Sequence, residues 1–211
     1  MATKKQIAER ALRILQGGDL NIDSDIDIRE VMLHVDSERD NLIQQKLVEN
    51  YKPRKSVAAV TAHEILGNYI SEHTISTSFD STRSQRYAML GQIPMDLPDN
   101  AGLLYVNNAE DFSISFAKMS PGLERTFVGL PSLAASKKSY YTQVGKKIFF
   151  DEDSAPTSVI VGMVAVSSSL SDTELYPVSP GDVSTIIKSI VDLYKIMVQV
   201  EQDNITDNID Q

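Results

Sequence analysis

The fold is decided by a stretch between Ser24 and Lys52, which reads SDIDIREVMLHVDSERDNLIQQKLVENYK. Its apolar residues recur at steps of three and four, the spacing of one helix face: Ile28, Val31, Met32, Val35, Leu42, Ile43 and Leu47. The residues assigned to the opposite, solvated face are Arg29, Glu30, Asp36, Glu38, Arg39, Asp40, Gln44, Gln45 and Lys46. Pro53 disfavours a helical conformation in the residue before it. The pattern predicts a helix over about 24–52, roughly 35–40 Å long.

A shorter helix is predicted ahead of this one, over Thr3 to Leu15. Thr3 and Gln6 have the spacing of a capping box, and Gly17-Gly18 favours a helix end. Two helices joined by a short acidic connector predict a helical hairpin. Beyond Pro53, the pattern of residues 56–66 fits either a short third helix or a strand.

From Gly67 the sequence alternates between apolar and polar residues, which predicts β-structure over residues 67–170. In the first strand, Tyr69, His73, Ile75 and Phe79 share one face. The candidate strands are Tyr69–Phe79, Arg86–Leu90, Leu103–Val106, Phe112–Phe116, Tyr140–Val144, Lys147–Phe150 and Ser158–Val166. A hairpin turn is predicted at residues 144–147, around Gly145.

Helix returns near the end of the chain. Ser179 is a candidate N-cap, followed by proline at the first helical position and an acid at the third. An apolar stripe then follows at helical spacing: Val183, Ile186, Ile187, Ile190, Val191, Leu193, Tyr194, Met197 and Val198. The tail from Glu201 to Gln211 has four acids and no bases, and is expected to be unstructured in isolation.

These elements predict an α+β fold in which the N-terminal helical hairpin and the C-terminal helix pack together. An antiparallel β-sheet module, sandwich-like or barrel-like, is inserted between them. The expected parts are residues 1–66 (helical), residues 67–170 (the β module), and residues 171–211 (the helix and acidic tail that complete the helical part).

The amino-acid composition excludes several kinds of functional site and partner. The chain has no cysteine, so disulfides, thiolate metal sites and cysteine nucleophiles are excluded. It carries no recognisable signal peptide and no apolar run near the ~20 residues that span a membrane, so no membrane partner is expected. Of the net charge of −9, six units belong to the last 41 residues. An acidic chain without a stripe of basic residues is a poor candidate for binding the phosphate groups of a nucleic acid.

An acidic segment between Asp19 and Glu30 has the oxygen spacing of an EF-hand loop. The oxygen side chains at its positions 1, 3, 5, 7, 9 and 12 are Asp19, Asn21, Asp23, Asp25, Asp27 and Glu30. Ser24 stands where the sharp turn needs glycine, Gly17-Gly18 breaks the entering helix, and no second loop is present to form a pair. The simpler interpretation is a polar connector whose acids cap the positive end of the long helix.

No catalytic pattern emerges. His63-Glu64 lacks the second histidine of a zincin helix, and His34 and His73 are expected in surface or packing roles. Lys137-Lys138 and Lys146-Lys147 flank Tyr140-Tyr141, a pattern that fits solvated hairpin ends better than a nucleic-acid contact. No nucleotide-binding glycine motif or serine-hydrolase elbow occurs. We therefore expect no catalytic, cofactor or metal site, and no enzyme.

Four segments together resemble a known family. They are Lys5–Asp19 (KQIAERALRILQGGD), Asp27–Leu33 (DIREVML), Ile93–Leu103 (IPMDLPDNAGL) and Tyr176–Asp182 (YPVSPGD). In these the chain resembles the head-to-tail connector proteins (ring or adaptor proteins) of tailed bacteriophages, in particular the crAss-like phages.

The resemblance implies a virion structural protein, made in the cytoplasm of the bacterial host and located in the neck between capsid and tail. It implies a ring, commonly of twelve copies, that docks under the portal protein, contacts other neck and tail proteins and lets DNA pass through its channel without sequence-specific binding. It implies no catalytic residues. The alternative is a soluble binding module, with calcium held by Asp19–Glu30 and a ligand such as a glycan bound by the β module.

Overall fold

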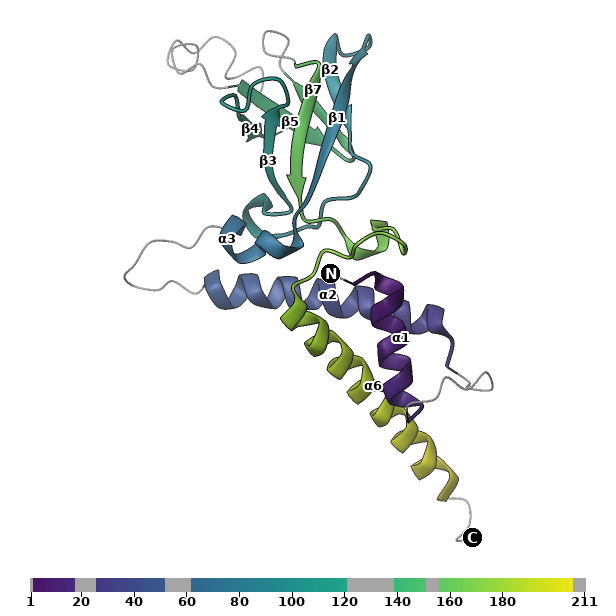
Figure 1. The fold of residues 1–211 in the computed structure, drawn as a ribbon. Helices are drawn as coiled ribbons and strands as arrows, with labels where there is room; N and C mark the ends of the chain where they lie inside the picture. The colour runs from purple at the N-terminus through teal and green to yellow at the C-terminus, as the bar shows by residue number, and fades with distance from the viewer. Residues whose placement is uncertain (1, 18–25, 52–61, 121–138, 151–155, 207–211) are drawn as a thin grey trace. The chain divides into compact units, whose positions relative to one another are not determined.

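The computed structural model describes residues 2–17, 26–51, 62–120, 139–150 and 156–206. The chain divides into two compact units. Both ends of the chain, Met1–Val60 and Ser167–Gln211, form what we call the helical unit. The middle, Thr61–Val166, forms the β unit, which is an insertion in the sequence of the helical unit. The predicted α+β class is confirmed (Figure 1).

Three helices pack against one another in the helical unit: α1 (Lys4–Leu15), α2 (Ile28–Tyr51) and α6 (Pro180–Thr206). The predicted capping box is present in α1, because the Thr3 side chain accepts from the Gln6 amide and the Gln6 side chain accepts from the Thr3 amide. After the C-cap Gln16, Gly17 adopts φ +70°, the left-handed conformation that glycine permits.

The buried apolar side chains of α1 and α2 recur at helical spacing, whereas Ile14 of α1 is 58% exposed. The buried ones are Ile7, Ala8, Ala11 and Leu12 on α1, and Val31, Val35, Ile43 and Leu47 on α2. The prediction is wrong for two polar residues of α2. The helical pattern places Asp36 and Arg39 on the solvated face, yet only 7% of Asp36 and none of Arg39 is exposed. Arg39 lies four residues after Val35 and four before Ile43, so it occupies the middle of the buried stripe.

α6 begins as predicted. The amide of Asp182 donates to the Ser179 hydroxyl, and Lys46 of α2 pairs with the Asp182 carboxylate at 2.6 Å. The helix continues to Thr206, so the expectation that the tail is unstructured from Glu201 is wrong for its first six residues. Residues 207–211 lie outside the described part of the chain.

The β unit opens with α3 (Ala62–Leu66) and a 3-10 turn, η1 (Gly67–Tyr69), which settles the open choice for residues 62–66 as helix. Its strands are β1 (Ser71–Asp80), β2 (Gln85–Met89), β3 (Leu103–Asn108), β4 (Phe116–Met119), β5 (Ser139–Val144), β6 (Lys147–Phe150) and β7 (Ser158–Met163). A short 3-10 turn, η2 (Pro98–Asn100), precedes β3. Another, η4 (Ser167–Ser169), follows β7 and already belongs to the helical unit.

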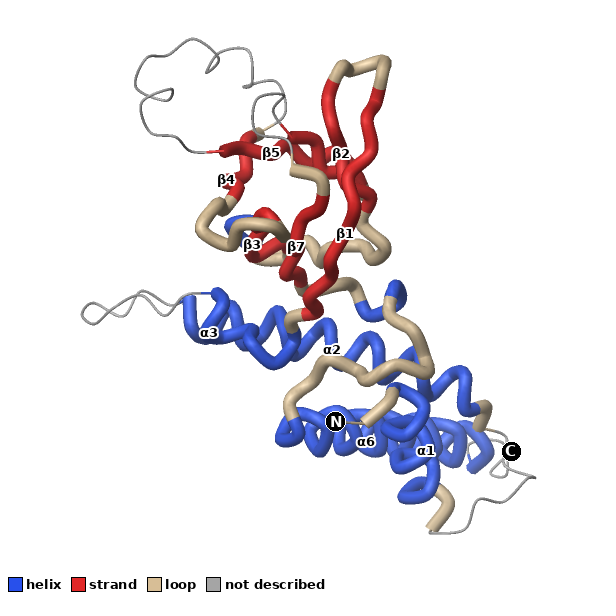
Figure 2. The backbone as a smooth tube through the Cα atoms, turned by 45° about the horizontal axis from the view of Figure 1, so that its top comes forward, coloured by secondary structure: helices blue, strands red, loops and turns tan. Residues whose placement is uncertain are grey.

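The seven strands form one sheet in the order β3-β7-β1-β2-β6-β5-β4, nearly closed into a barrel (Figure 2). Neighbouring strands are antiparallel except β4 and β5, which are parallel. The two end strands approach where Asn107 pairs with Ser115 and the Asn108 amide donates to the Ile114 carbonyl at 3.0 Å. Gly145 has φ +60° in the β5–β6 turn, which confirms the predicted hairpin.

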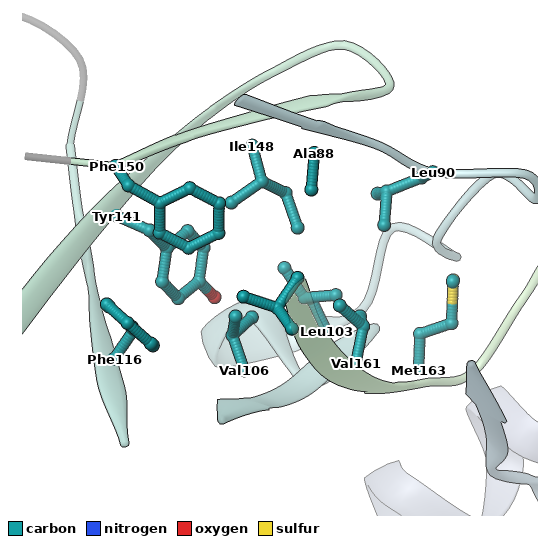
Figure 3. Close-up of a cluster of buried hydrophobic side chains, with 11 residues drawn as sticks. Ala88, Leu90, Leu103, Val106, Phe116, Tyr141, Ile148, Phe150, Val161 and Met163 are labelled. Atoms are coloured by element: carbon teal, nitrogen blue, oxygen red, sulfur yellow. The ribbon is translucent and has the colours of Figure 1, made fainter. Parts of the chain in front are cut away.

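An apolar cluster of buried side chains lies inside the sheet (Figure 3). Phe116 and Phe150 meet edge to face with ring centroids 5.1 Å apart. The buried members of the cluster are Ala88, Leu90, Leu103, Val106, Phe116, Tyr141, Ile148, Phe150, Val159, Val161 and Met163.

The strand prediction is wrong in several details, since Tyr69 lies in η1 rather than in the first strand and residues 164–166 lie beyond the end of β7. Residues 112–115 form a turn and an isolated bridge rather than a strand, because the Asp111 carboxylate accepts from the Ser113 amide and bends the chain. Phe79 is 59% exposed, although it shares its predicted face with His73 and Ile75. The pairing of β1 with β7 ends at Ser76 and Ser158, so Phe79 lies where β1 pairs with β2 alone.

Candidate functional site

The most concentrated polar chemistry in the described residues is a buried ionic network in the helical unit. Lys4 of α1 contacts the carboxylate of Asp36 at 3.1 Å and that of Asp172 at 2.5 Å. The hydroxyl of Tyr176 donates to the other Asp36 oxygen at 2.7 Å. Burial alone lowers the pKa of Lys4, but its hydrogen bonds to Asp172 and Asp36 outweigh burial and raise the pKa above its ordinary value.

The second half of the network is centred on Arg39. Its Nε donates to the Pro177 carbonyl at 3.1 Å, and its Nη1 donates to the Ser167 hydroxyl at 2.9 Å and to Asp40 at 3.2 Å. Ser167 in turn donates to Asp40 at 2.5 Å. A fully buried guanidinium is stable only when it is paired and hydrogen-bonded in this way.

The network ties α1 and α2 to the segment that returns from the β unit. Lys4, Asp36 and Arg39 come before the insertion, and Ser167, Asp172 and Tyr176 come after it. The Tyr176 amide also donates to the Ala2 carbonyl at 3.1 Å, beside an antiparallel bridge between Thr3 and Leu175. These ion pairs and hydrogen bonds join three parts of the helical unit, which suits a structural clamp.

Sequence reasoning missed this network. The only local signal is the spacing of Asp36, Arg39 and Asp40, which places three charges on adjacent turns of a helix. Their partners on the returning segment lie far along the chain: Tyr176 comes 140 residues after Asp36.

The acidic loop is only partly described. Asp19, Asn21, Asp23 and Asp25 lie outside the described residues. Asp27 caps α2, since its carboxylate accepts from the Arg29 amide at 2.9 Å and its carbonyl accepts from Glu30 and Val31. This is the capping role that the simpler interpretation assigns to the acids of the loop. Glu30 lies 4.0 Å from His34, its neighbour one helical turn later.

The three histidines lie in separate settings. His34 of α2 meets the Tyr194 ring edge on at 5.5 Å. His63 of α3 lies 5.9 Å from the Tyr105 ring, and His73 of β1 bonds the Gln92 side chain at 3.2 Å. Across the described ranges, no group of three or more His, Asp or Glu side chains is arranged to hold a metal ion.

The lysines and tyrosines in the described part of residues 137–147 do not form one surface in the structure. Lys137 and Lys138 lie outside the described residues. Tyr141 is in the apolar cluster, where burial raises its pKa, and is therefore closed to a ligand. The ammonium of Lys147 instead lies 4.6 Å from the ring centroid of Tyr87 on the neighbouring strand.

A close contact between a side chain of β3 and the backbone of β7 was also not predicted from the sequence. Tyr105 lies over Gly162, where an added Cβ would meet the ring at 2.1 Å. The Tyr105 hydroxyl donates to Glu72 of β1 at 2.6 Å, so the ring spans three adjacent strands. Burial, with the hydrogen bond to Glu72, raises the pKa of Tyr105 to about 12.

Comparison with models of known protein families and with curated proteins finds no match for this chain. Among the described residues, no helix combines the length and apolar character that crossing a bilayer requires.

Proposed function

We propose that this chain is a virion structural protein that forms a ring in the head-to-tail connector of a tailed bacteriophage of the crAss-like type. In this role, about twelve copies close a ring below the portal protein, provide an attachment point for further neck and tail proteins, and leave a central channel for DNA. The resemblance of four sequence segments to connector proteins motivates the proposal, and the helical unit supplies its physical support.

The observation that carries the proposal is the exposed apolar side of α6. This helix of 27 residues is about 40 Å long, whereas α1 has 12 residues and is about 18 Å long. α1 therefore cannot cover the whole of α6. Leu193 and Ile196, on adjacent turns of α6, are 37% and 59% exposed. Neighbouring exposed apolar residues on a long helix favour burial against another subunit.

The charge distribution is compatible with a DNA passage. The last 41 residues hold eight acids and two bases. If they line the channel, they repel phosphates and let DNA slide, because binding to DNA depends on cations that replace its counterions.

The test is the solution mass of the purified chain, alone and mixed with the portal protein of the same phage, followed by cryo-EM of the virion. A closed ring, or a ring formed on the portal, with density for this chain in the neck is the expected result. Leu193→Ser together with Ile196→Ser should prevent ring formation without unfolding the chain, while Ile14→Ser, at an exposed site on α1, serves as the control. A chain absent from the virion would overturn the proposal.

A further inference from the structure

One exposed side of α2 is free of charge over about four helical turns. From Leu33 to Val48, a span that the structure describes in full, all exposed side chains are uncharged. They are Leu33, Ser37, Asn41, Gln44, Gln45 and Val48. Their spacing places them on one side of the helix, which we call the uncharged side of α2. A helix side that faces water normally carries charged residues, and 23% of the residues of this chain are charged.

The charged residues of the same span lie on the packed side of α2 or at its margin. They are Asp36, Glu38, Arg39, Asp40 and Lys46, and each is buried or half-buried. Asp36 pairs with Lys4 of α1 at 3.1 Å, as described above. Lys46 pairs with Asp182 of α6 at 2.6 Å. The helix therefore turns its ion pairs inward and its uncharged side outward, the reverse of a helix whose outer side is solvated.

An uncharged side with an aliphatic residue at each end suits contact with another protein surface. Leu33 and Val48 are 66% and 61% exposed, and they lie about 22 Å apart along the helix. Between them, Ser37, Asn41 and Gln44 carry groups that donate and accept hydrogen bonds. The core of a protein interface is depleted of charged residues relative to the rest of the surface. The composition of this side therefore favours burial in an assembly.

The positions on the uncharged side match those of a second copy of the same helix. In an antiparallel pair whose two-fold axis passes beside Asn41, Leu33 faces Val48 of the second copy and Ser37 faces Gln44 of the second copy. Apolar groups then meet apolar groups, polar groups meet polar groups, and the symmetry repeats each contact. We propose that α2 of one copy packs antiparallel against α2 of a second copy through this side. A crossing angle of about 20° keeps both ends of the contact together.

The charge at the start of α2 selects the antiparallel direction. Glu30 is exposed one turn before Leu33, in line with the uncharged side. In a parallel pair, Glu30 would lie opposite Glu30 of the second copy, and like charges in contact oppose association. In the antiparallel pair the two glutamates lie at opposite ends of the contact. The positive end of each helix dipole then lies beside the negative end of the other.

This contact goes beyond the proposed ring and does not depend on it. A two-fold contact closes at two copies, so it cannot continue from subunit to subunit around a ring. It also uses α2, whereas the ring is proposed to form through α6. One helix against one helix buries less than the standard interface of about 1,600 Å², so single chains should pair weakly, with a Kd in the micromolar range.

Cysteine cross-linking tests the pair directly, because the chain has no cysteine of its own. Asn41→Cys lies beside the two-fold axis, so its sulfur meets its own copy at the short range that a disulfide needs. Under mild oxidation, full-length Asn41→Cys should form a covalent dimer roughly tenfold faster or more than a chain whose cysteine lies outside the contact. Arg10→Cys, at an exposed site on α1, is that matched control. Non-reducing gels follow the dimer with time.

Two further cysteines report the direction of the helices. In the antiparallel pair, two copies of Leu33→Cys lie about 22 Å apart, as do two copies of Val48→Cys, so each variant alone should cross-link no faster than the control. An equimolar mixture of the two should give a mixed dimer, identified by mass spectrometry. A parallel pair would give the opposite result, with rapid cross-linking of each variant alone.

Charge substitution tests the same contact without cysteine. Ser37→Glu with Gln44→Glu places acids opposite acids, and Ser37→Lys with Gln44→Lys places bases opposite bases. Each variant alone should self-associate roughly tenfold more weakly than the wild type in analytical ultracentrifugation, and an equimolar mixture should associate again. Lys5→Glu with Arg10→Glu, on α1, is the control for a change of net charge. Circular dichroism of each variant separates lost pairing from lost folding.

Two outcomes would overturn the inference. One is a folded Asn41→Cys chain that cross-links no faster than Arg10→Cys, which would assign the uncharged side to a different protein or to the β unit. The other is rapid cross-linking of Leu33→Cys alone, which would exclude the antiparallel pair. The proposed function is judged separately: a ring in the virion neck without the α2 cross-link would remove only this inference, and the cross-link without the chain in the virion would remove only that function.

Discussion

The guanidinium of Arg39 is fully buried and lies 5.4 Å from the centroid of the Tyr176 ring. One residue belongs to the chain before the inserted β unit and the other to the chain after it. Arg39 also bonds Ser167 and the Pro177 carbonyl, so one side chain holds three points of the returning segment. The helical unit is therefore closed by polar contacts as well as by apolar packing.

Replacing Arg39 should be among the most destabilising single changes in the helical unit. Arg39→Ala leaves Asp40 without its cation and opens a cavity in the buried stripe of α2. Breaking a buried ion pair by removing one partner costs about 3–5 kcal/mol. Urea unfolding should show this loss, whereas Arg29→Ala, on the exposed side of the same helix, should change the free energy of unfolding by less than about 0.5 kcal/mol. Equal stability of the two variants would contradict the assigned role of Arg39.

Tyr176→Phe isolates the hydroxyl that donates to Asp36. The variant keeps the ring beneath Arg39 but leaves one buried carboxylate oxygen without this donor, at a cost of about 1–3 kcal/mol at neutral pH. Leu175→Ala, at the neighbouring position that is 65% exposed, is the control and should have little effect.

The same variant should alter the response to alkaline pH. Burial, with the nearby Asp36 carboxylate, raises the pKa of Tyr176 above the ordinary value near 10. Above that value the unfolded chain releases this proton while the folded chain keeps it, so the stability of the folded state falls by up to about 1.4 kcal/mol per pH unit for this group. Lys4, with its raised pKa, acts in the same direction. In unfolding measurements between pH 9 and 11.5, Tyr176→Phe should lose stability less steeply than the wild type.

Gly162 is the position of β7 that should tolerate a methyl group least. In Gly162→Ala the new Cβ would overlap the Tyr105 ring, which must move away from Glu72. Overpacking of this kind costs about 1–3 kcal/mol. Gly91→Ala is the matched control, because an added Cβ there has no atom within 4 Å. In a Tyr105→Ala background the cost of Gly162→Ala should largely disappear, and a double-mutant cycle that shows no coupling would refute the contact.

Sequence reasoning recovered the elements whose signal is local. α1, α2 and the start of α6 are marked by helical spacing and by caps at Thr3 and Ser179. The β5–β6 hairpin is marked by Gly145. Each of these depends on residues within a few positions of one another, so a single sequence is enough.

The features that were missed depend on contacts between distant residues. Polar residues on a helix are assigned to the solvent side by default, and nothing near Asp36 or Arg39 in sequence indicates that Tyr176 and Pro177 cover them. The parallel pairing of β4 with β5 likewise could not be predicted, because the alternation of apolar and polar residues does not encode the direction in which two strands pair. The turn at Asp111 is the exception, because its Asp-x-Ser hydrogen bond joins residues two positions apart and is a local signal in the sequence.

Asp27 provides the test of the capping interpretation against the calcium interpretation. Asp27→Ala removes the carboxylate that accepts from the Arg29 amide, and should cost about 0.5–2 kcal/mol. Asp27→Asn retains a side-chain acceptor and should be close to the wild type, although it removes the charge at the ninth position of the proposed calcium loop. Melting temperatures with calcium and with EDTA complete the comparison. A capping role gives the same order of stabilities in both conditions, because the amide of Arg29 needs an acceptor whether or not calcium is present. A calcium site would instead stabilise the wild type when calcium is added and give the asparagine variant a much smaller gain, since a carboxylate ligand would have been lost.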